Sequence, residues 1–228
     1  MEKERISDCW YVNVCNQECS VTCIRYTEMK HLMNTSDIPK IMQIPTLLEA
    51  GEDYTPFCVL SDIKDNITDF VTSGNNLYIT SKNPGNGKTS WAIKLMLKYF
   101  DEVWAGNGFQ TRGLFVHVPT FLLKAKDVKE PMTEEYKKAL LNCDLVIWDD
   151  IGSISISQYD YSQLLMYIDN RILSKKSNIF TSNVEDREQL NKTVGDKLTS
   201  RIYNTSQVVT FKGKDRRNTF NGTVANNQ

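Results

Sequence analysis

The chain has 228 residues, enough to bury one good hydrophobic core. Of these, 40% are hydrophobic and 24% are charged, as in an ordinary globular protein, and no apolar run approaches the ~18 residues that a membrane span needs. The net charge of −1 excludes a global positive field for nucleic acid, so any DNA contact has to come from a local patch. The first residues, MEKERISDCW, lack the basic and then apolar order of a signal peptide, so we expect a cytoplasmic protein.

Four of the six cysteines, Cys9, Cys15, Cys19 and Cys23, lie close together near the start of the chain. Without an export signal, such a cluster favours a metal site over disulfides. These thiolates would suffice for a tetrahedral Zn²⁺, with Cys9 and His31 as alternatives for the fourth ligand. A segment this short needs a metal to stay folded. The spacing departs from paired C-x2-C, so an iron–sulfur cluster and unliganded cysteines stay open as alternatives.

The chain divides into four regions. Residues 1–35 hold the cysteines and a helical run at 23–33, whereas residues 36–58 contain three prolines and are expected to form an extended linker. Over residues 59–220, β-rich runs alternate with helical periodicity, which predicts an α/β fold with a parallel sheet flanked by helices on both faces. The polar residues 221–228 are expected to be a disordered tail. The predicted strands are 76–80, 113–118, 144–148, 177–181 and 207–211, and the predicted helices are 90–100, 120–126, 133–142, 158–173 and 185–202.

The loop after the first predicted strand, TSKNPGNGKTS, has most of the pattern of a phosphate-binding loop. Its glycines would let backbone N–H groups turn inward at a helix N-terminus, Lys88 would reach the β- and γ-phosphates, and the Thr89 hydroxyl would complete a Mg²⁺ shell. Lys82 stands where the pattern has its first glycine, and a side chain fits there if φ stays negative. The alternative is a glycine turn that precedes a helix by chance. The predicted nucleotide-binding residues are Pro84, Gly85, Asn86, Gly87, Lys88, Thr89 and Ser90.

The predicted strand at 144–148 ends in two carboxylates, Asp149 and Asp150. Beside a phosphate-binding loop, Asp149 would hold Mg²⁺, directly or through water, and Asp150 would polarise the attacking water as a general base. The alternative is a solvated acidic turn after an ordinary strand.

Asn183 follows the predicted strand at 177–181. It would emerge beside the Asp149 strand, where its amide could orient water or the γ-phosphate. The same letters, T-S-N, are also an ordinary start of a helix.

In chain order, the segments PGNGKT, IWDDIG, FTSN and SRI resemble those of the AAA+ ATPases of the bacterial and phage helicase-loader group, the DnaC/DnaI-like proteins. The resemblance covers roughly residues 59–217. It implies a P-loop NTPase fold of the AAA+, ASCE type and Mg²⁺-dependent hydrolysis of ATP. Lys88 and Thr89 then correspond to Walker A, Asp149 and Asp150 to Walker B, and Asn183 to sensor 1.

The resemblance also implies roles for arginines that the sequence alone explains equally well as surface residues. Arg201 fits the arginine finger that reaches a neighbour's nucleotide, and Arg217, or Arg216, fits the sensor 2-like arginine. Arg171 is similar to an arginine common in the group and has no assigned role. Lys82 departs from the family pattern and bears on the rate of hydrolysis more than on binding.

The partners implied by the resemblance are a replicative DnaB-type helicase, held by the N-terminal segment, and single-stranded DNA. The chain would self-associate through its ATP sites into a hexamer or an open spiral, in the cytoplasm of a bacterium that hosts a phage or mobile element. Lys124, Lys126 and Lys129 fall in a region that lines the channel of assembled AAA+ rings and would contact DNA phosphates. A solvated face, interleaved with Asp127 and Glu130, is the alternative.

Two other functions fit the same motifs. One is a transposition helper ATPase of the IstB-like kind, which acts on DNA for a transposase. The other is an adaptor or inhibitor of the helicase that binds nucleotide without turnover, although the Asp149–Asp150 pair argues against it.

Overall fold

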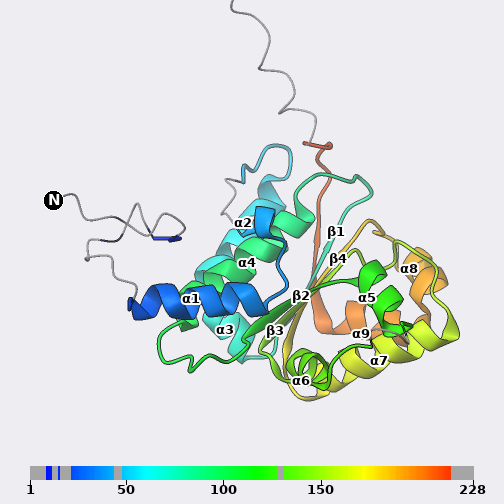
Figure 1. Ribbon diagram of the computed structural model, residues 1–228. Coiled ribbons are helices and arrows are strands. Elements are labelled where there is room, and N and C mark those ends of the chain that lie inside the picture. Colours follow the sequence, from blue (N-terminus) through cyan, green and yellow to red (C-terminus); the bar gives the residue numbers. More distant parts are fainter. Residues whose placement is uncertain (1–8, 12–14, 16–21, 44–47, 128–130, 217–228) are drawn as a thin grey trace, which may run out of the picture.

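The computed structural model describes residues 9–11, 15, 22–43, 48–127 and 131–216 (Figure 1). Within these residues, five strands form one sheet in the order β2-β3-β4-β1-β5, and every neighbouring pair is parallel. This confirms the predicted parallel α/β fold. The strands are β1 (Asn76–Thr80), β2 (Gly113–His117), β3 (Leu145–Asp149), β4 (Ser177–Ser182) and β5 (Ser206–Thr210).

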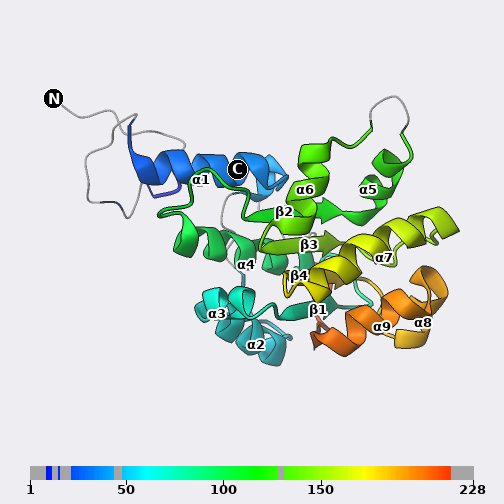
Figure 2. The ribbon, with the colours of Figure 1, turned by 90° about the horizontal axis from the view of Figure 1, so that it is seen from below.

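Two layers of helices cover the sheet (Figures 1 and 2). Two separate hydrophobic clusters, one on each face, bury the strands between these layers. One layer consists of α1 (Ile24–Thr35), α2 (Tyr54–Asp65), α3 (Ile67–Thr72) and α4 (Lys88–Val103), with the short 3-10 helix η1 (Lys40–Met42) nearby. The other consists of α5 (Val118–Ala125), α6 (Glu134–Asn142), α7 (Gln158–Leu173), α8 (Arg187–Val194) and α9 (Asp196–Thr205).

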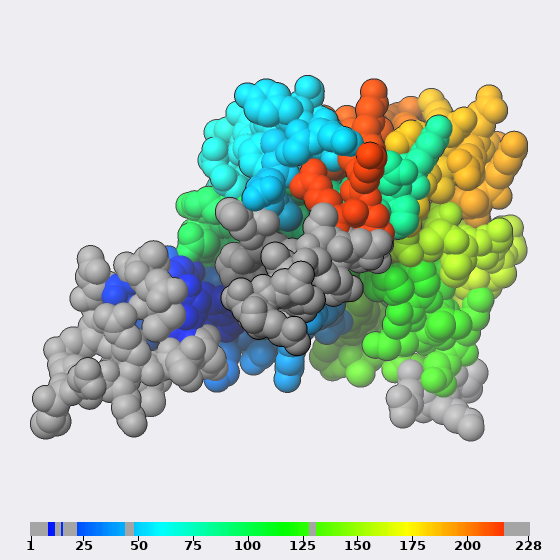
Figure 3. Space-filling view, turned by 90° about the horizontal axis from the view of Figure 1, so that it is seen from above, coloured from blue at the N-terminus to red at the C-terminus, as the bar shows by residue number. Residues whose placement is uncertain are grey.

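Beyond β5, the chain continues alongside the loop that follows β1. Phe211 extends the pairing of β5 with β1, because its N–H donates to the carbonyl of Thr80 at 2.8 Å. In Figure 3, the orange-red residues after β5 lie beside the cyan residues around α2 and the blue-green loop after β1. Segments distant in the sequence therefore meet at the carboxyl end of β1.

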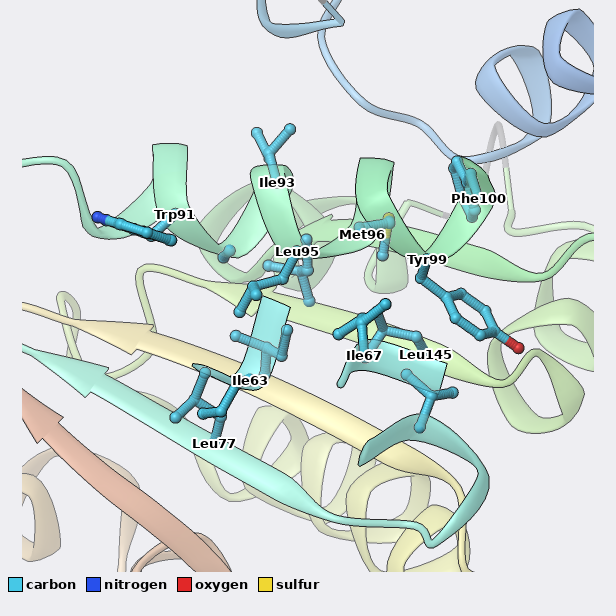
Figure 4. Close-up of a cluster of buried hydrophobic side chains, with 14 of the residues drawn as sticks. Ile63, Ile67, Leu77, Trp91, Ile93, Leu95, Met96, Tyr99, Phe100 and Leu145 are labelled. Atoms are coloured by element: carbon cyan, nitrogen blue, oxygen red, sulfur yellow. The ribbon is translucent and has the colours of Figure 1, made fainter. Parts of the chain in front are cut away.

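Helix α4 is fixed to the sheet by the first hydrophobic cluster (Figure 4). Along β1, Leu77 and Ile79 join this cluster, whereas Tyr78 joins the opposite one, as expected for a strand buried on both faces. Leu95 and Met96 of α4 are fully buried against these strands. This packing holds in place the helix that begins at Lys88.

Helix α1 packs in the same cluster as α4, through Met29, Leu32 and Met33. Nearby, Asp101 near the end of α4 accepts hydrogen bonds from the Tyr11 hydroxyl at 2.6 Å and from Arg25 at 2.8 Å. The described part of the N-terminal segment is thus attached to the helical layer. The division of the chain at residues 35, 58 and 220 stays a prediction.

The predicted linker and the long predicted helix differ from the structure. Helix α2 begins at Tyr54, inside the expected linker, because Pro56 falls in its first turn, where a missing N–H removes no helical hydrogen bond. The predicted helix at 185–202 is two helices, since Gly195 has a φ of 85° and separates α8 from α9. Helices α2 and α3 were not predicted before residue 76. Among the described helices, none is long and apolar enough to cross a membrane.

Candidate functional site

The loop of residues 81–87 connects β1 to α4 and is held by its own side chains. Gly85 and Gly87 have φ values of 70° and 100°, which favour glycine. The Asn86 amide donates to the Ser81 hydroxyl at 2.6 Å. The buried ammonium of Lys88 donates to the carbonyl of Asn83 at 3.0 Å and to the Asn86 amide oxygen at 3.2 Å. The loop therefore presents backbone N–H groups and a cation at the N-terminus of α4, which suits a phosphate group.

Lys82 stands where the loop pattern has its first glycine, and its side chain points away from the inside of the loop. Its side chain is 75% exposed, and its ammonium lies 3.8 Å from the Glu185 carboxylate, which also accepts a hydrogen bond from the Lys82 backbone N–H at 3.0 Å. Lys82 is not among the described non-glycine residues with positive φ, which are Asp37, Phe109, Asp150 and Lys175. A lysine at this position is therefore compatible with the loop.

Asp149, the last residue of β3, receives two hydroxyl hydrogen bonds on one oxygen. Thr89 donates to its Oδ1 at 2.8 Å, and Thr181 of β4 donates to the same atom at 2.7 Å. Burial raises the pKa of Asp149, the two hydroxyl hydrogen bonds lower it in part, and the neighbouring Asp150 raises it again. Hard oxygen donors from Thr89 and Asp149 thus lie together, and this donor set fits Mg²⁺.

Asp150 has a strained backbone and a fixed side chain. Its φ is 62°, in the left-handed region, and its N–H donates to the Thr181 hydroxyl at 3.0 Å. The Asn183 amide donates to the Asp150 carboxylate at 3.1 Å. The strain is offset by these contacts, and Asp150 lines the same pocket as Asp149.

One pocket of about 400 Å³ collects these groups. It brings together the predicted loop residues 84–90, both aspartates and Asn183. Three further residues line it that the sequence did not single out: Met42, His117 and Thr181. In the sequence, His117 lies near the end of the predicted strand 113–118, and in the sheet it pairs with Asp149. Thr181 lies within the FTSN segment.

The predicted arginines do not line this pocket. Arg201 on α9 forms an ion pair with Asp169 on α7 at 2.5 Å, and its side chain is 46% exposed. Arg216 donates to the carbonyls of Glu49 and Ala50 at 2.6 and 3.1 Å. Arg217 lies outside the described residues.

Arg171 is fully buried and donates hydrogen bonds to backbone carbonyls in the interior. Its guanidinium donates to the carbonyls of Leu140, Cys143 and Ser177 at 2.7–2.9 Å and to the Asn178 side chain at 2.8 Å. Burial lowers its pKa. Arg171 thus ties the end of α6 to β4, on the far side of the sheet from the phosphate-binding loop's helix.

The predicted zinc ligands are not brought together among the described residues. No group of three or more His, Cys, Asp or Glu side chains there could hold a metal ion. Free thiols are found at Cys9, Cys15 and Cys23. The His31 ring contacts the Phe109 ring edge-on, with the two ring centroids 5.4 Å apart. Cys19 lies outside the described residues, so the zinc site stays a prediction.

The three lysines proposed for DNA have different surroundings. Lys124 lines a second hollow of about 620 Å³, whose walls include Phe115, Phe121 and Tyr136. Lys126 is paired with Asp160 at 2.7 Å. Lys129 lies outside the described residues.

The sequence matches the family of IstB-like ATP binding proteins over residues 24–221. Among solved structures, the chain is similar to the DnaC helicase loader (19% identity, 76% of this chain and 100% of that chain, TM-score 0.63). It is also similar to DnaI (18% identity, 80% of this chain and 95% of that chain, TM-score 0.63). A third similar structure is AMPPCP-bound DnaA from Aquifex aeolicus (18% identity, 76% of this chain and 50% of that chain, TM-score 0.58).

At these identities, the solved structures establish the fold, which is that of the AAA+ P-loop NTPases, as predicted. No curated protein matches the chain. The family match, by contrast, spans most of the sequence. The chain therefore belongs to the family of IstB-like ATP binding proteins, the IstB/DnaC-like AAA+ ATPases.

Proposed function

We propose that this protein is an ATP-dependent loader that places a replicative DnaB-type helicase on single-stranded DNA at the initiation of replication. The observation that carries the proposal is the meeting of the phosphate-binding loop, Asp149, Asp150 and Asn183 around one pocket. The likeness of the fold to a helicase loader and to DnaI supports the choice of partner.

ATP would bind with its phosphates at the N-terminus of α4. Lys88 would exchange its present acceptors, the Asn83 carbonyl and the Asn86 amide oxygen, for oxygens of the β- and γ-phosphates. Thr89 and Asp149 would hold Mg²⁺, which neutralises phosphate charge when bound.

Hydrolysis would use the residues at the ends of β3 and β4. Asp150 would accept the proton of the attacking water, and Asn183 would hold the Asp150 carboxylate in place through the 3.1 Å hydrogen bond. Thr181 would keep Asp149 and Asp150 in fixed relation, since its hydroxyl contacts both.

A second subunit would complete the site. Arg201 does not line the pocket of its own chain and is partly exposed on α9, which suits a residue that acts on a neighbour's nucleotide. We therefore propose a hexamer or open spiral with ATP between adjacent subunits, in which hydrolysis releases or resets the loader.

The N-terminal segment would hold the helicase, and the AAA+ part would bind single-stranded DNA through Lys124. Tyr11 and Arg25 both contact Asp101 of α4, so helicase bound to this segment would be linked to the helix that begins at Lys88. We further propose that Zn²⁺ holds the cysteines, with Cys19 included, and that the protein acts in the bacterial cytoplasm.

The test is co-purification of the full chain with the host replicative helicase, with ATP and with metal analysis of the same sample. We expect a complex that loads helicase on single-stranded DNA, and loss of both ATP binding and loading in Lys88→Ala. Loading that survives in Lys88→Ala would refute the proposal. Capture of a transposase in place of the helicase would point to the IstB-like activity, and a complex without any ATPase rate would point to an adaptor.

A further inference from the structure

Asp53 is a buried carboxylate that plays no part in the chemistry proposed above. It lies directly before α2 and is only 2% exposed. Its Oδ1 accepts backbone hydrogen bonds from Lys212 at 2.6 Å and from Gly213 at 3.0 Å, and its Oδ2 lies 3.6 Å from the Arg216 guanidinium. A buried carboxylate with these donors fixes a segment some 160 residues away in the chain.

That segment, residues 211–216, is here named the C-terminal strap. The strap lies against the phosphate-binding loop, since the Asn83 amide donates to the carbonyls of Lys212 and Gly213 at 3.2 and 3.1 Å. The backbone N–H of Arg216 donates to the carbonyl of Gly85 at 3.1 Å. The strap therefore holds the loop at two of its residues.

The Arg216 side chain locks the strap from the other side. It donates to the carbonyls of Glu49 and Ala50 and approaches Asp53, so the strap lies between residues 49–53 and the loop (Figure 3). The fit at Gly213 is close, because a Cβ there would collide with Asp53 Oδ2. Arg216 is thus engaged in holding the strap.

We propose that Asp53 is a positioning residue of the nucleotide site, acting through the strap. The strap fixes Asn83 and Gly85, and the Asn83 carbonyl in turn accepts the hydrogen bond of Lys88. This inference rests on the proposed binding of ATP by Lys88. Linkage makes the effect reciprocal: nucleotide that orders the loop also stabilises the strap.

The first variant is Asp53→Asn in the full chain, which keeps the shape of the side chain and removes its charge. Below its melting temperature, we expect a fluorescent ATP analogue to bind about tenfold more weakly. Amide hydrogen exchange is expected to rise in both 81–87 and 211–216, and nucleotide should no longer slow exchange in the strap. Asp62→Asn, on an exposed position of α2, is the matched control and should leave all three readouts unchanged.

The second variant is Asn83→Ala, which removes the loop's amide but keeps the carbonyl that Lys88 contacts. It carries the test if Asp53→Asn does not fold. We expect the same weaker binding, and in the double variant a loss smaller than the sum of the two.

Exchange that rises in the strap alone, with unchanged loop exchange and nucleotide affinity, would overturn the inference. Failure of the proposed function looks different: the wild-type protein would bind no ATP, or would bind it independently of Lys88.

Discussion

At the scale of single residues, the Thr181 hydroxyl is the link between the two acidic residues of the pocket. It donates to Asp149 and accepts from the backbone N–H of Asp150. The carboxylates were predictable because they follow an apolar strand. Thr181 was not, because its importance depends on β4 lying beside β3, which is visible only in the folded sheet.

Thr181→Val tests this link. Valine keeps the shape but cannot hydrogen-bond, so Asp150 loses the contact that offsets its strained backbone, and we expect turnover of ATP to fall by about tenfold or more. Stability should fall by about 1 kcal/mol, because the partly buried N–H of Asp150 loses its partner. Steady-state ATPase assays and urea unfolding measure the two effects. Thr210→Val, at the end of β5, is the control, and equal losses in both variants would contradict the assignment.

Arg171, unlike Thr181, does not line the pocket, and its hydrogen bonds to buried carbonyls give it a role in stability. Arg171→Met would leave the carbonyls of Leu140, Cys143 and Ser177 without their donor in the interior. We expect a loss of about 3–5 kcal/mol in the free energy of unfolding, measured by urea titration, because several buried acceptors lose their donor at about 1–3 kcal/mol each. At low temperature, the folded variant should still bind ATP, and a selective loss of ATP binding without a loss of stability would assign Arg171 to the site.

At the scale of elements, the sequence predicted all five strands to within a residue or two, because each is a short β-rich run between helical segments. It did not predict α2 and α3, since the prolines before residue 59 suggested a linker. The side chains of Leu60, Ile63 and Ile67 are buried in the cluster that α4 shares, and such tertiary packing stabilises short helices. The hydrogen bonds of Asp53 to the C-terminal strap could not be predicted from the sequence either, because only the order of the strands brings these partners together.

Helix α4 couples the core to the nucleotide site, since one helix carries both Lys88 and the buried Leu95. Leu95→Ala should cost about 2–5 kcal/mol of stability and also weaken ATP binding, because a cavity beneath the helix loosens its N-terminus. Lys98→Ala, on the same helix but partly exposed, should change neither. Thermal melts with and without ATP measure both effects. Unaltered affinity in a destabilised Leu95→Ala would show that the loop is positioned independently of the core.

At the scale of the whole molecule, the site is divided between subunits in the proposed assembly. Arg201→Ala should bind ATP normally and lose most of its turnover, by about a thousandfold if it acts as an arginine finger. Lys88→Ala should lose both ATP binding and turnover. Mixing the two inactive variants should restore part of the ATPase rate, because one kind of interface then has an intact loop facing an intact arginine. Mixtures that stay inactive, although they co-assemble, would place Arg201 outside the site.

The turn after α1 has a consequence for the edge of the sheet. β2 is a terminal strand in the sheet order, and an uncovered terminal strand offers unpaired N–H and C=O groups to any passing chain. Here the Ser36 carbonyl accepts the Phe115 N–H at 2.7 Å, and Ile38 is buried beside it. The turn therefore covers part of this edge, and we expect a variant that loses the contact between Ser36 and Phe115 to expose β2 to edge-to-edge pairing between copies.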